Sequence, residues 1–134
     1  MRVHGACHCG GIAFEAEIDP ARVRICHCAD CQKLSGTAFR VVAPCAEADF
    51  ALLRGTPKLY IKVAESGNRR QQAFCGDCGS PLYATSDEPA GNRKLGLRVG
   101  ILAERADLVP RRQFWMRSAL AWLPRLPGEA TQTE

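Results

Sequence analysis

The sequence predicts a mainly β domain of short strands with one or two short helical turns, held together by bound metal. Three observations support this fold class. Apolar residues alternate with polar ones in short segments, turns containing Gly or Pro separate these segments, and seven of the eight cysteines fall into three tight clusters. With 134 residues and a net charge of +4, the chain has the size of one domain and an ordinary globular composition.

Six segments of the sequence have the pattern or composition of β-strands. Ile12, Phe14, Ala16 and Ile18 alternate with small or acidic residues, which is the period of a half-buried strand. The further strand candidates are rich in β-branched, aromatic or leucine side chains and comprise residues 38–43, 58–63, 71–74, 82–84 and 95–101. Together these short segments indicate a mostly β domain.

One helix is predicted for residues 29–34, where Ser35-Gly36 provides the stop signal. Turns or loops are expected at 55–57, 66–68 and 88–91, each with a glycine. No interior segment has the composition of a linker. We therefore expect a single zinc-binding domain over residues 1–126, followed by a polar C-terminal tail over 127–134.

The composition also bears on the location of the protein. No segment reaches the roughly 18 consecutive apolar residues of a membrane span, and the N-terminus lacks the apolar run of a secretion signal. We expect a cytoplasmic protein with no membrane or nucleic-acid partner, because its basic residues are scattered. In that reducing compartment cysteines bind metal or act in catalysis. The alternative is a disulfide-rich secreted domain, which the CxC and CxxC spacings disfavour.

The three cysteine clusters differ in capacity. The first contributes Cys7 and Cys9, and the third contributes Cys75 and Cys78, whereas the middle cluster contributes three cysteines. Two plus two gives four thiolates, the set of a closed structural zinc site, while three thiolates leave one position open. A glycine follows the second cysteine of the first and third clusters, as a tight turn around the metal requires. These two clusters are therefore paired, and a site of mixed clusters is the alternative.

The middle cluster consists of Cys26, Cys28 and Cys31. Cys26 and Cys28 point to the same side of an extended segment, and Cys31 returns from the first turn of the predicted helix. The helix N-terminus favours the thiolate form. A zinc ion held there has room for a thiol, which binds as a nucleophilic thiolate. These three residues are therefore the predicted catalytic group.

Three further residues are weighed as ligands. His8 lies between two ligands and is interpreted as a bystander. His27 is also interpreted as a bystander, with closure of the middle site or acid–base catalysis as the alternative. Cys45 is isolated in the sequence, so it is interpreted as a small core residue or a free thiol.

The three clusters and their neighbours resemble those of a known family. The segments that carry the resemblance are Gly5-Ala6-Cys7-His8-Cys9-Gly10-Gly11-Ile12, Cys26-His27-Cys28-Ala29-Asp30-Cys31-Gln32-Lys33 and Phe74-Cys75-Gly76-Asp77-Cys78-Gly79-Ser80-Pro81-Leu82. In this order they are similar to the glutathione-dependent formaldehyde-activating enzymes, also called S-(hydroxymethyl)glutathione synthase-like proteins. Gln32 departs from the family, which often has arginine there, and Cys45 is not part of the pattern.

The resemblance implies an Mss4-like β-tent, that is, short curled antiparallel sheets tied by zinc. It implies one structural zinc on Cys7, Cys9, Cys75 and Cys78, and one labile catalytic zinc on Cys26, Cys28 and Cys31. The implied activity is that of a carbon–sulfur lyase, which condenses glutathione with formaldehyde to S-hydroxymethylglutathione.

The expected function is therefore a zinc-dependent carbon–sulfur lyase-type enzyme that adds glutathione, or a related thiol, to formaldehyde or another small aldehyde. Glutathione has two carboxylates, so its site needs cations, and the candidates are Lys33, Arg40, Arg69, Arg70 and Arg98. Phe39 and Trp115 are candidate pocket walls, with core packing as the preferred interpretation of both. The alternative function is a non-enzymatic zinc-binding interaction module of Mss4-like fold.

Overall fold

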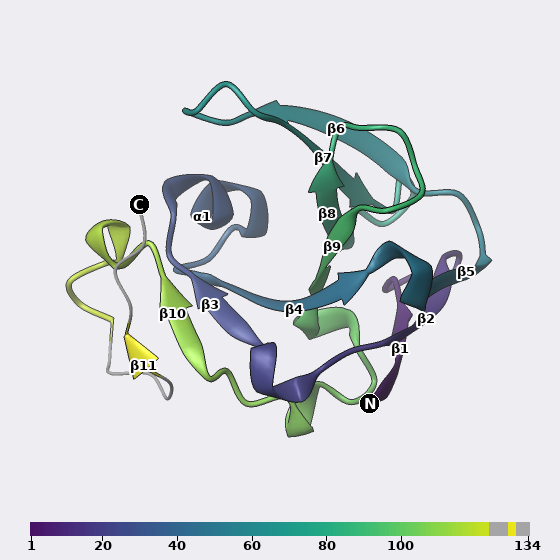
Figure 1. Cartoon of the computed structure of the whole chain (residues 1–134), viewed down its shortest axis with the longest axis horizontal. Coiled ribbons are helices and arrows are strands. Elements are labelled where there is room, and N and C mark those ends of the chain that lie inside the picture. The colour runs from purple at the N-terminus through teal and green to yellow at the C-terminus, as the bar shows by residue number, and fades with distance from the viewer. Residues whose placement is uncertain (124–128, 131–134) are drawn as a thin grey trace.

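The computed structural model describes residues 1–123 and 129–130. Two sheets form the framework of this part of the chain, and they confirm the predicted mainly β fold (Figure 1). The smaller sheet has the order β1 (Arg2–Ala6), β2 (Ala13–Glu17) and β5 (Phe50–Arg54). The larger sheet has the order β11 (Glu129–Ala130), β10 (Arg112–Phe114), β3 (Arg24–Cys26), β4 (Arg40–Ala46), β9 (Lys94–Arg98), β8 (Pro81–Ser86), β7 (Arg69–Phe74) and β6 (Lys58–Val63).

The strand pairs are antiparallel with one local exception. β10 runs parallel to both β3 and β11, so the edge of the larger sheet departs from the antiparallel pattern that was expected. This edge is possible because the chain from β3 to β10 is long enough to return to the same end of the sheet. It brings Phe114 opposite Cys26, close to the middle cysteine cluster.

The predicted strands match the structure to different degrees. β6 has the predicted bounds, and the other predicted segments overlap β2, β4, β7, β8 and β9. The segment 95–101 ends as a strand at Arg98 and continues as a 3₁₀ turn over Val99–Ile101. The sequence did not predict β1, β3, β5, β10 or β11. It also did not locate the 3₁₀ turns, which span Pro20–Arg22, Glu47–Asp49, Val99–Ile101, Arg105–Asp107 and Met116–Ser118.

The helix α1 (Ala29–Ser35) begins and ends close to the predicted residues. Cys28 is its N-cap, and Gly36 ends it in the left-handed conformation at φ +70°. The side-chain amide of Gln32 donates to the carbonyl oxygens of His27, at 2.8 Å, and Ser118, at 2.9 Å. This residue therefore ties α1 to the C-terminal segment.

The apolar core lies between the two sheets. β2 contributes Phe14, and β8 and β9 contribute Leu82 and Leu97, all of them almost completely buried. A chain of aromatic contacts continues this packing, since the Phe50 ring lies 4.9 Å from Phe14 and 5.2 Å from Tyr83 between centroids. Burial of large apolar side chains from both sheets is the main source of stability for such a fold.

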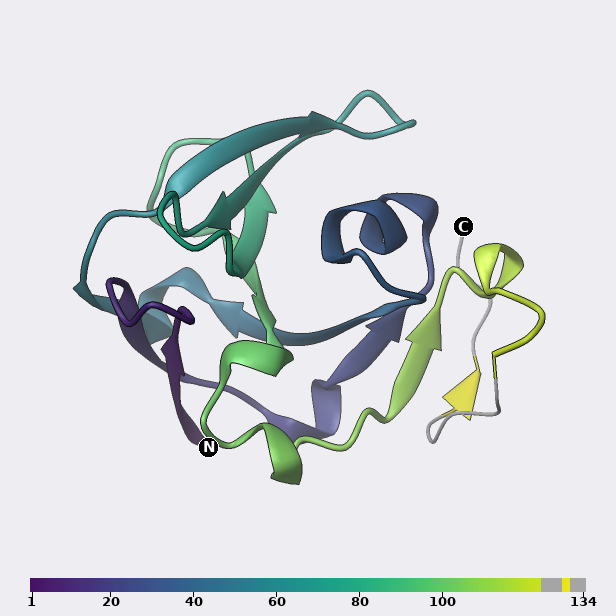
Figure 2. The same ribbon diagram turned by 180° about the vertical axis from the view of Figure 1, so that it is seen from behind.

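The opposite face of the larger sheet is concave and holds α1. Figures 1 and 2 show the helix in the hollow of the curved sheet, with β3 and β4 beside it and β6 and β7 across from it. Because side chains alternate along a strand, the residues between the core positions of β4 and β9 point into this hollow. The curvature of the sheet thus creates the space in which the candidate site lies.

The predicted C-terminal tail is described only in part. Glu129–Ala130 form β11, and the rest of the tail, residues 127–128 and 131–134, lies outside the described residues. The boundary between residues 126 and 127 stays a prediction. Among the described residues no helix combines the length and hydrophobicity needed to cross a membrane.

Candidate metal centres

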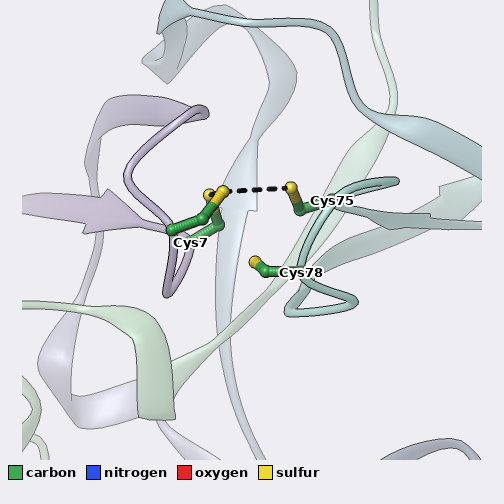
Figure 3. A group of neighbouring side chains, drawn as sticks. Cys7, Cys75 and Cys78 are labelled. Carbon is green, nitrogen blue, oxygen red and sulfur yellow. Dashed lines mark hydrogen bonds between the residues drawn. The ribbon is translucent and has the colours of Figure 1, made fainter.

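The first and third cysteine clusters form one centre. Cys7 and Cys9 lie on the turn between β1 and β2, and Cys75 and Cys78 lie on the turn between β7 and β8. Their four sulfur atoms all lie within 4.8 Å of one another, with Cys9 Sγ 3.6 Å from Cys7 Sγ and 3.8 Å from Cys75 Sγ. Figure 3 shows Cys7, Cys75 and Cys78 converging from the two turns. A tetrahedral zinc with bonds of about 2.3 Å separates its sulfurs by about 3.8 Å, so the geometry fits zinc.

The two turns have the conformation expected from their glycines. Gly10 and Gly79 both have φ +78°, which side chains other than glycine rarely adopt. The Ile12 amide donates to Cys7 Sγ at 3.2 Å, and the His8 amide donates to the Ser80 hydroxyl of the other turn at 3.0 Å. The turns are thereby fixed both to their own sulfurs and to each other.

Hydrogen bonds favour the ionised form of Cys78 and Cys7 at this centre. The hydroxyl and amide of Ser80 lower the pKa of the Cys78 thiol to about 5. Burial raises the pKa of Cys7, but the Ile12 amide and the thiols of Cys9 and Cys75 outweigh burial and leave this pKa below its usual value. At Cys9 the Gly11 amide lowers the pKa, but the neighbouring thiols outweigh it and raise this pKa to about 12. Ionised sulfurs are the form that binds zinc.

The middle cluster forms a separate centre, as the sequence predicts. The sulfur atoms of Cys26, Cys28 and Cys31 lie within 4.8 Å of one another, and all three residues are half-buried. Cys26 ends β3, Cys28 caps α1, and the Cys31 amide donates to Cys28 Sγ at 3.3 Å. Hydrogen bonds from the Cys26 and Cys31 thiols lower the pKa of Cys28. The helix N-terminus and its neighbours thus favour a thiolate here.

The other candidate ligands lie apart from both centres. His27 is almost completely buried, and its Nε2 lies 2.8 Å from the Gln113 Oε1, away from the three sulfurs. Cys45 is a core residue of β4, and its thiol donates to the carbonyl oxygens of Glu17 and Ala46. Burial raises the pKa of Cys45 to about 11. His8 is exposed and belongs to neither group of sulfurs.

A cavity of about 520 Å³ adjoins the three-cysteine centre in the hollow of the larger sheet. Seven cationic side chains line it: Arg22, Arg24, Arg40, Lys62, Arg70, Lys94 and Arg98. The lining has one carboxylate, that of Asp30, and it already pairs with Lys62 at 2.8 Å. Such an excess of positive charge in a concave site attracts anionic ligands.

Strand register places two of these arginines beside the cysteines. Arg40 on β4 lies opposite Cys26 on β3, and Arg98 on β9 lies opposite Val42, two residues along β4. Side chains two residues apart share one face of a strand, so Cys26 and both arginines face the cavity. Burial and the charge of Arg40 lower the pKa of Arg98 to about 9.

The remaining predicted cations lie in different places. Arg70 lines the cavity. Lys33 is exposed and lies outside the cavity lining, and Arg69 pairs with Asp87 at 2.9 Å. Sequence reasoning overlooked four lining cations, Arg22, Arg24, Lys62 and Lys94. Strand alternation would have identified two of them, Arg24 and Lys94. Arg24 lies on the same face of β3 as Cys26, and Lys94 lies on the same face of β9 as Arg98.

Trp115 closes the cavity next to the cysteines. It lines both this cavity and a second one of about 700 Å³, which also reaches Cys28. Its backbone has φ +58° and ψ +44°, an unfavourable conformation for a bulky residue. The Arg117 guanidinium lies 4.8 Å from the centre of its ring. Phe39, the other predicted wall residue, instead packs against His27.

Comparison with known proteins identifies the family of this chain. A family model described as glutathione-dependent formaldehyde-activating enzyme matches residues 2–118, so the chain belongs to this family, as the sequence motifs predict. A curated Halomonas elongata protein named "Putative glutathione-dependent formaldehyde-activating enzyme" is 28% identical over 87 residues, which cover 62% of this chain. The match spans only 55% of that relative's length.

A solved structure supports the fold. The crystal structure of a Rhodobacter sphaeroides protein matches with a TM-score of 0.58 and 25% sequence identity. The match covers 75% of this chain and 87% of the other.

Proposed function

We propose that this family member is a zinc-dependent carbon–sulfur lyase-type enzyme that adds glutathione, or a related thiol, to formaldehyde or another small aldehyde. The observation that carries the proposal is the group of three sulfurs, from Cys26, Cys28 and Cys31, at the wall of a cation-lined cavity. The names of the family and of the curated relative support the choice of thiol and aldehyde.

The donor sets support two different zinc ions. We propose that Cys7, Cys9, Cys75 and Cys78 hold a structural zinc, and that Cys26, Cys28 and Cys31 hold a labile catalytic one. A zinc ion held by Cys26, Cys28 and Cys31 would supply a Lewis acid at the cavity wall, which would lower the pKa of a thiol there and favour its nucleophilic thiolate near neutral pH.

The side chains of the cavity have distinct roles in this proposal. The cations along the lining attract the carboxylates of glutathione. Phe114 and Trp115 line the same cavity as the three cysteines, and Phe114 lies opposite Cys26, so we expect their rings to limit the access of water. A thiolate held in such a place is better desolvated, and therefore more reactive, than one in bulk water.

The reaction balances without a redox partner. A bond forms between the sulfur of the thiolate and the carbonyl carbon of the aldehyde. The π electron pair of the carbonyl moves to its oxygen, which takes a proton from water, and a hemithioacetal results. The reverse reaction breaks the same carbon–sulfur bond, which is the lyase direction.

The experiment is an NMR exchange measurement of ¹³C-formaldehyde with glutathione, with and without protein. Because the two react without a catalyst, the quantity of interest is the acceleration by the protein. We expect Cys28→Ser to remove most of it and Cys45→Ala, which removes a thiol outside both centres, to retain it. A folded Cys28→Ser protein that accelerates exchange like wild type would refute the proposed mechanism.

One observation favours the second candidate, an interaction module. β5 and β6 carry five exposed apolar side chains, Leu52, Leu53, Leu59, Tyr60 and Val63, and Val63 lines the second cavity together with Cys28. Exposed apolar groups of this kind are common at protein interfaces. A stable protein partner that binds wild type and Cys28→Ser equally well, without any acceleration of exchange, would support this function instead.

We also propose a cytoplasmic location. All eight cysteines are free thiols, and the seven at the two centres bind metal only when they are reduced. A reducing compartment keeps them in that form.

A further inference from the structure

Two arginines in the floor of the cavity lack a carboxylate partner among the described residues. Arg40 is 6% exposed and Arg98 is 8% exposed, and the Nε atom of each is buried without a hydrogen-bond partner among the described residues. Neither guanidinium pairs with a carboxylate in that part of the chain. Burying an unpaired charge is costly, so such a pair is usually retained for a ligand that completes it.

The protein holds these arginines in fixed positions. Nη2 of Arg98 donates to Oε1 of Gln72 on β7 at 2.8 Å, which orients the guanidinium plane. Arg40 and Arg98 lie on neighbouring strands of the same sheet face, and both line the cavity. Two oriented guanidinium groups suit a planar carboxylate, which accepts hydrogen bonds from both at once.

The position relative to the sulfurs limits the size of the ligand. The order β3, β4, β9 places Arg40 one strand and Arg98 two strands from Cys26. Neighbouring strands lie about 4.8 Å apart, so a group bound between the arginines lies roughly 5–10 Å from the sulfurs. A carboxylate a few bonds away from a thiol spans that distance.

We propose that Arg40 and Arg98 form a subsite for the carboxylate of the thiol substrate, so that the site selects short mercapto acids and peptides with an equivalent carboxylate over neutral thiols. The inference rests on the proposed function in one respect, the binding of a thiol beside Cys26, Cys28 and Cys31. It goes further because it makes the carboxylate, rather than the complete tripeptide, the recognised feature.

A structural role for the two arginines predicts a different result. If their charges only offset those of the three thiolates, their loss weakens zinc retention and affects all thiols equally. If they bind a carboxylate, their loss affects only the acidic thiol. The ratio of the two affinities separates these roles.

The experiment compares an anionic probe, 3-mercaptopropionate, with its neutral methyl ester, methyl 3-mercaptopropionate. Each is titrated calorimetrically into the full-length, zinc-loaded protein without aldehyde, and the zinc content is measured afterwards. We expect wild type to bind the acid more tightly. We expect Arg98→Gln to reduce this preference by about 10- to 100-fold, the usual effect of losing a hydrogen bond to a charged group.

Matched variants make the result decisive. Arg98→Lys should retain part of the preference, and Arg2→Gln, which removes an exposed arginine of β1, should retain all of it. If Arg98→Gln does not fold, the wild-type comparison and Arg40→Gln still test the proposal. Equal affinities for acid and ester in wild type, or an unchanged preference in a folded Arg98→Gln protein, overturn it.

The outcome is independent of catalysis. A protein that prefers the acid but does not accelerate the aldehyde reaction would contradict the proposed function and support the subsite. A protein that accelerates the reaction but binds acid and ester equally would support the proposed function and contradict the subsite.

Discussion

The two cysteine centres are built from the same side chain but differ in their surroundings and in how far apart their ligands lie in the sequence. The centre of four sulfurs, here called the closed centre, joins the turn of one sheet to the turn of the other, and its ligands Cys9 and Cys75 are 66 residues apart. The centre of three sulfurs, here called the open centre, comes from one short segment, Cys26 to Cys31, at the end of a strand and the start of a helix. The closed centre connects distant parts of the chain, whereas the open one borders a cavity.

This difference indicates how one residue type serves two purposes. We propose that the four sulfurs joining the two sheets stabilise the fold, because a metal there would close a long loop of the unfolded chain. Three sulfurs beside a cavity contribute little to tertiary connection, and a zinc ion held by them would have room for a further ligand. The contrast can be tested by disturbing each centre in turn.

The largest expected effect comes from removing one ligand of each centre. Zinc binding in small peptides is worth about 10–16 kcal/mol, as much as the stability of a typical domain. Cys75→Ser should therefore unfold or become insoluble, whereas Cys28→Ser should remain folded. Circular dichroism during heating and the soluble yield measure both. A soluble Cys75→Ser protein that unfolds cooperatively would contradict the structural assignment of the closed centre.

The next effect concerns the metal content. Three thiolates bind zinc less tightly than four, and glutathione competes for the open position. Elemental analysis of the reduced protein should find close to two zinc ions per chain, falling towards one after dialysis against glutathione. Two ions that both withstand dialysis would show that the centres do not differ in lability. No zinc in the folded protein would exclude both.

The smallest effect comes from two glycines at positive φ. Gly79 at +78° belongs to the closed centre, and Gly36 at +70° ends α1 behind the open one. An added methyl group meets open space at both, so each change to alanine costs only backbone strain, about 1–2 kcal/mol in the free energy of unfolding. Chemical denaturation measures this cost.

Metal competition then separates the two glycine variants. Only Gly79→Ala should weaken zinc at the closed centre, because this glycine shapes the turn that carries Cys78. A chromogenic zinc chelator measures the change against wild type. An equal loss of closed-centre affinity in Gly36→Ala would show that general destabilisation, rather than turn geometry, determines binding.

Much of the site was predictable because it depends on local chemistry. Spacing placed Cys26, Cys28 and Cys31 on one strand end and helix start, and a glycine after the second cysteine marked the turns of the closed centre. The strand at Lys58–Val63 was predicted because its composition is strongly β-forming. Each of these features depends on residues close together in the chain.

The missed features have a physical reason as well. β3 has three residues, too few for an alternating pattern, and β5 is largely exposed, so neither has a clear hydrophobic period. Arg69 and Arg70 are indistinguishable as neighbouring basic residues in the sequence. In the structure strand alternation directs Arg70 to the cavity, while Arg69 pairs with Asp87.

The sequence by itself therefore determined the fold class, the two cysteine sets and their difference in capacity. Only the tertiary structure decided which cations meet the open centre. Their arrangement depends on the register of β3, β4 and β9, which sets Arg40 opposite Cys26 and Arg98 opposite Val42. Register arises from the packing of a whole sheet against its core, so no single segment of the chain contains it.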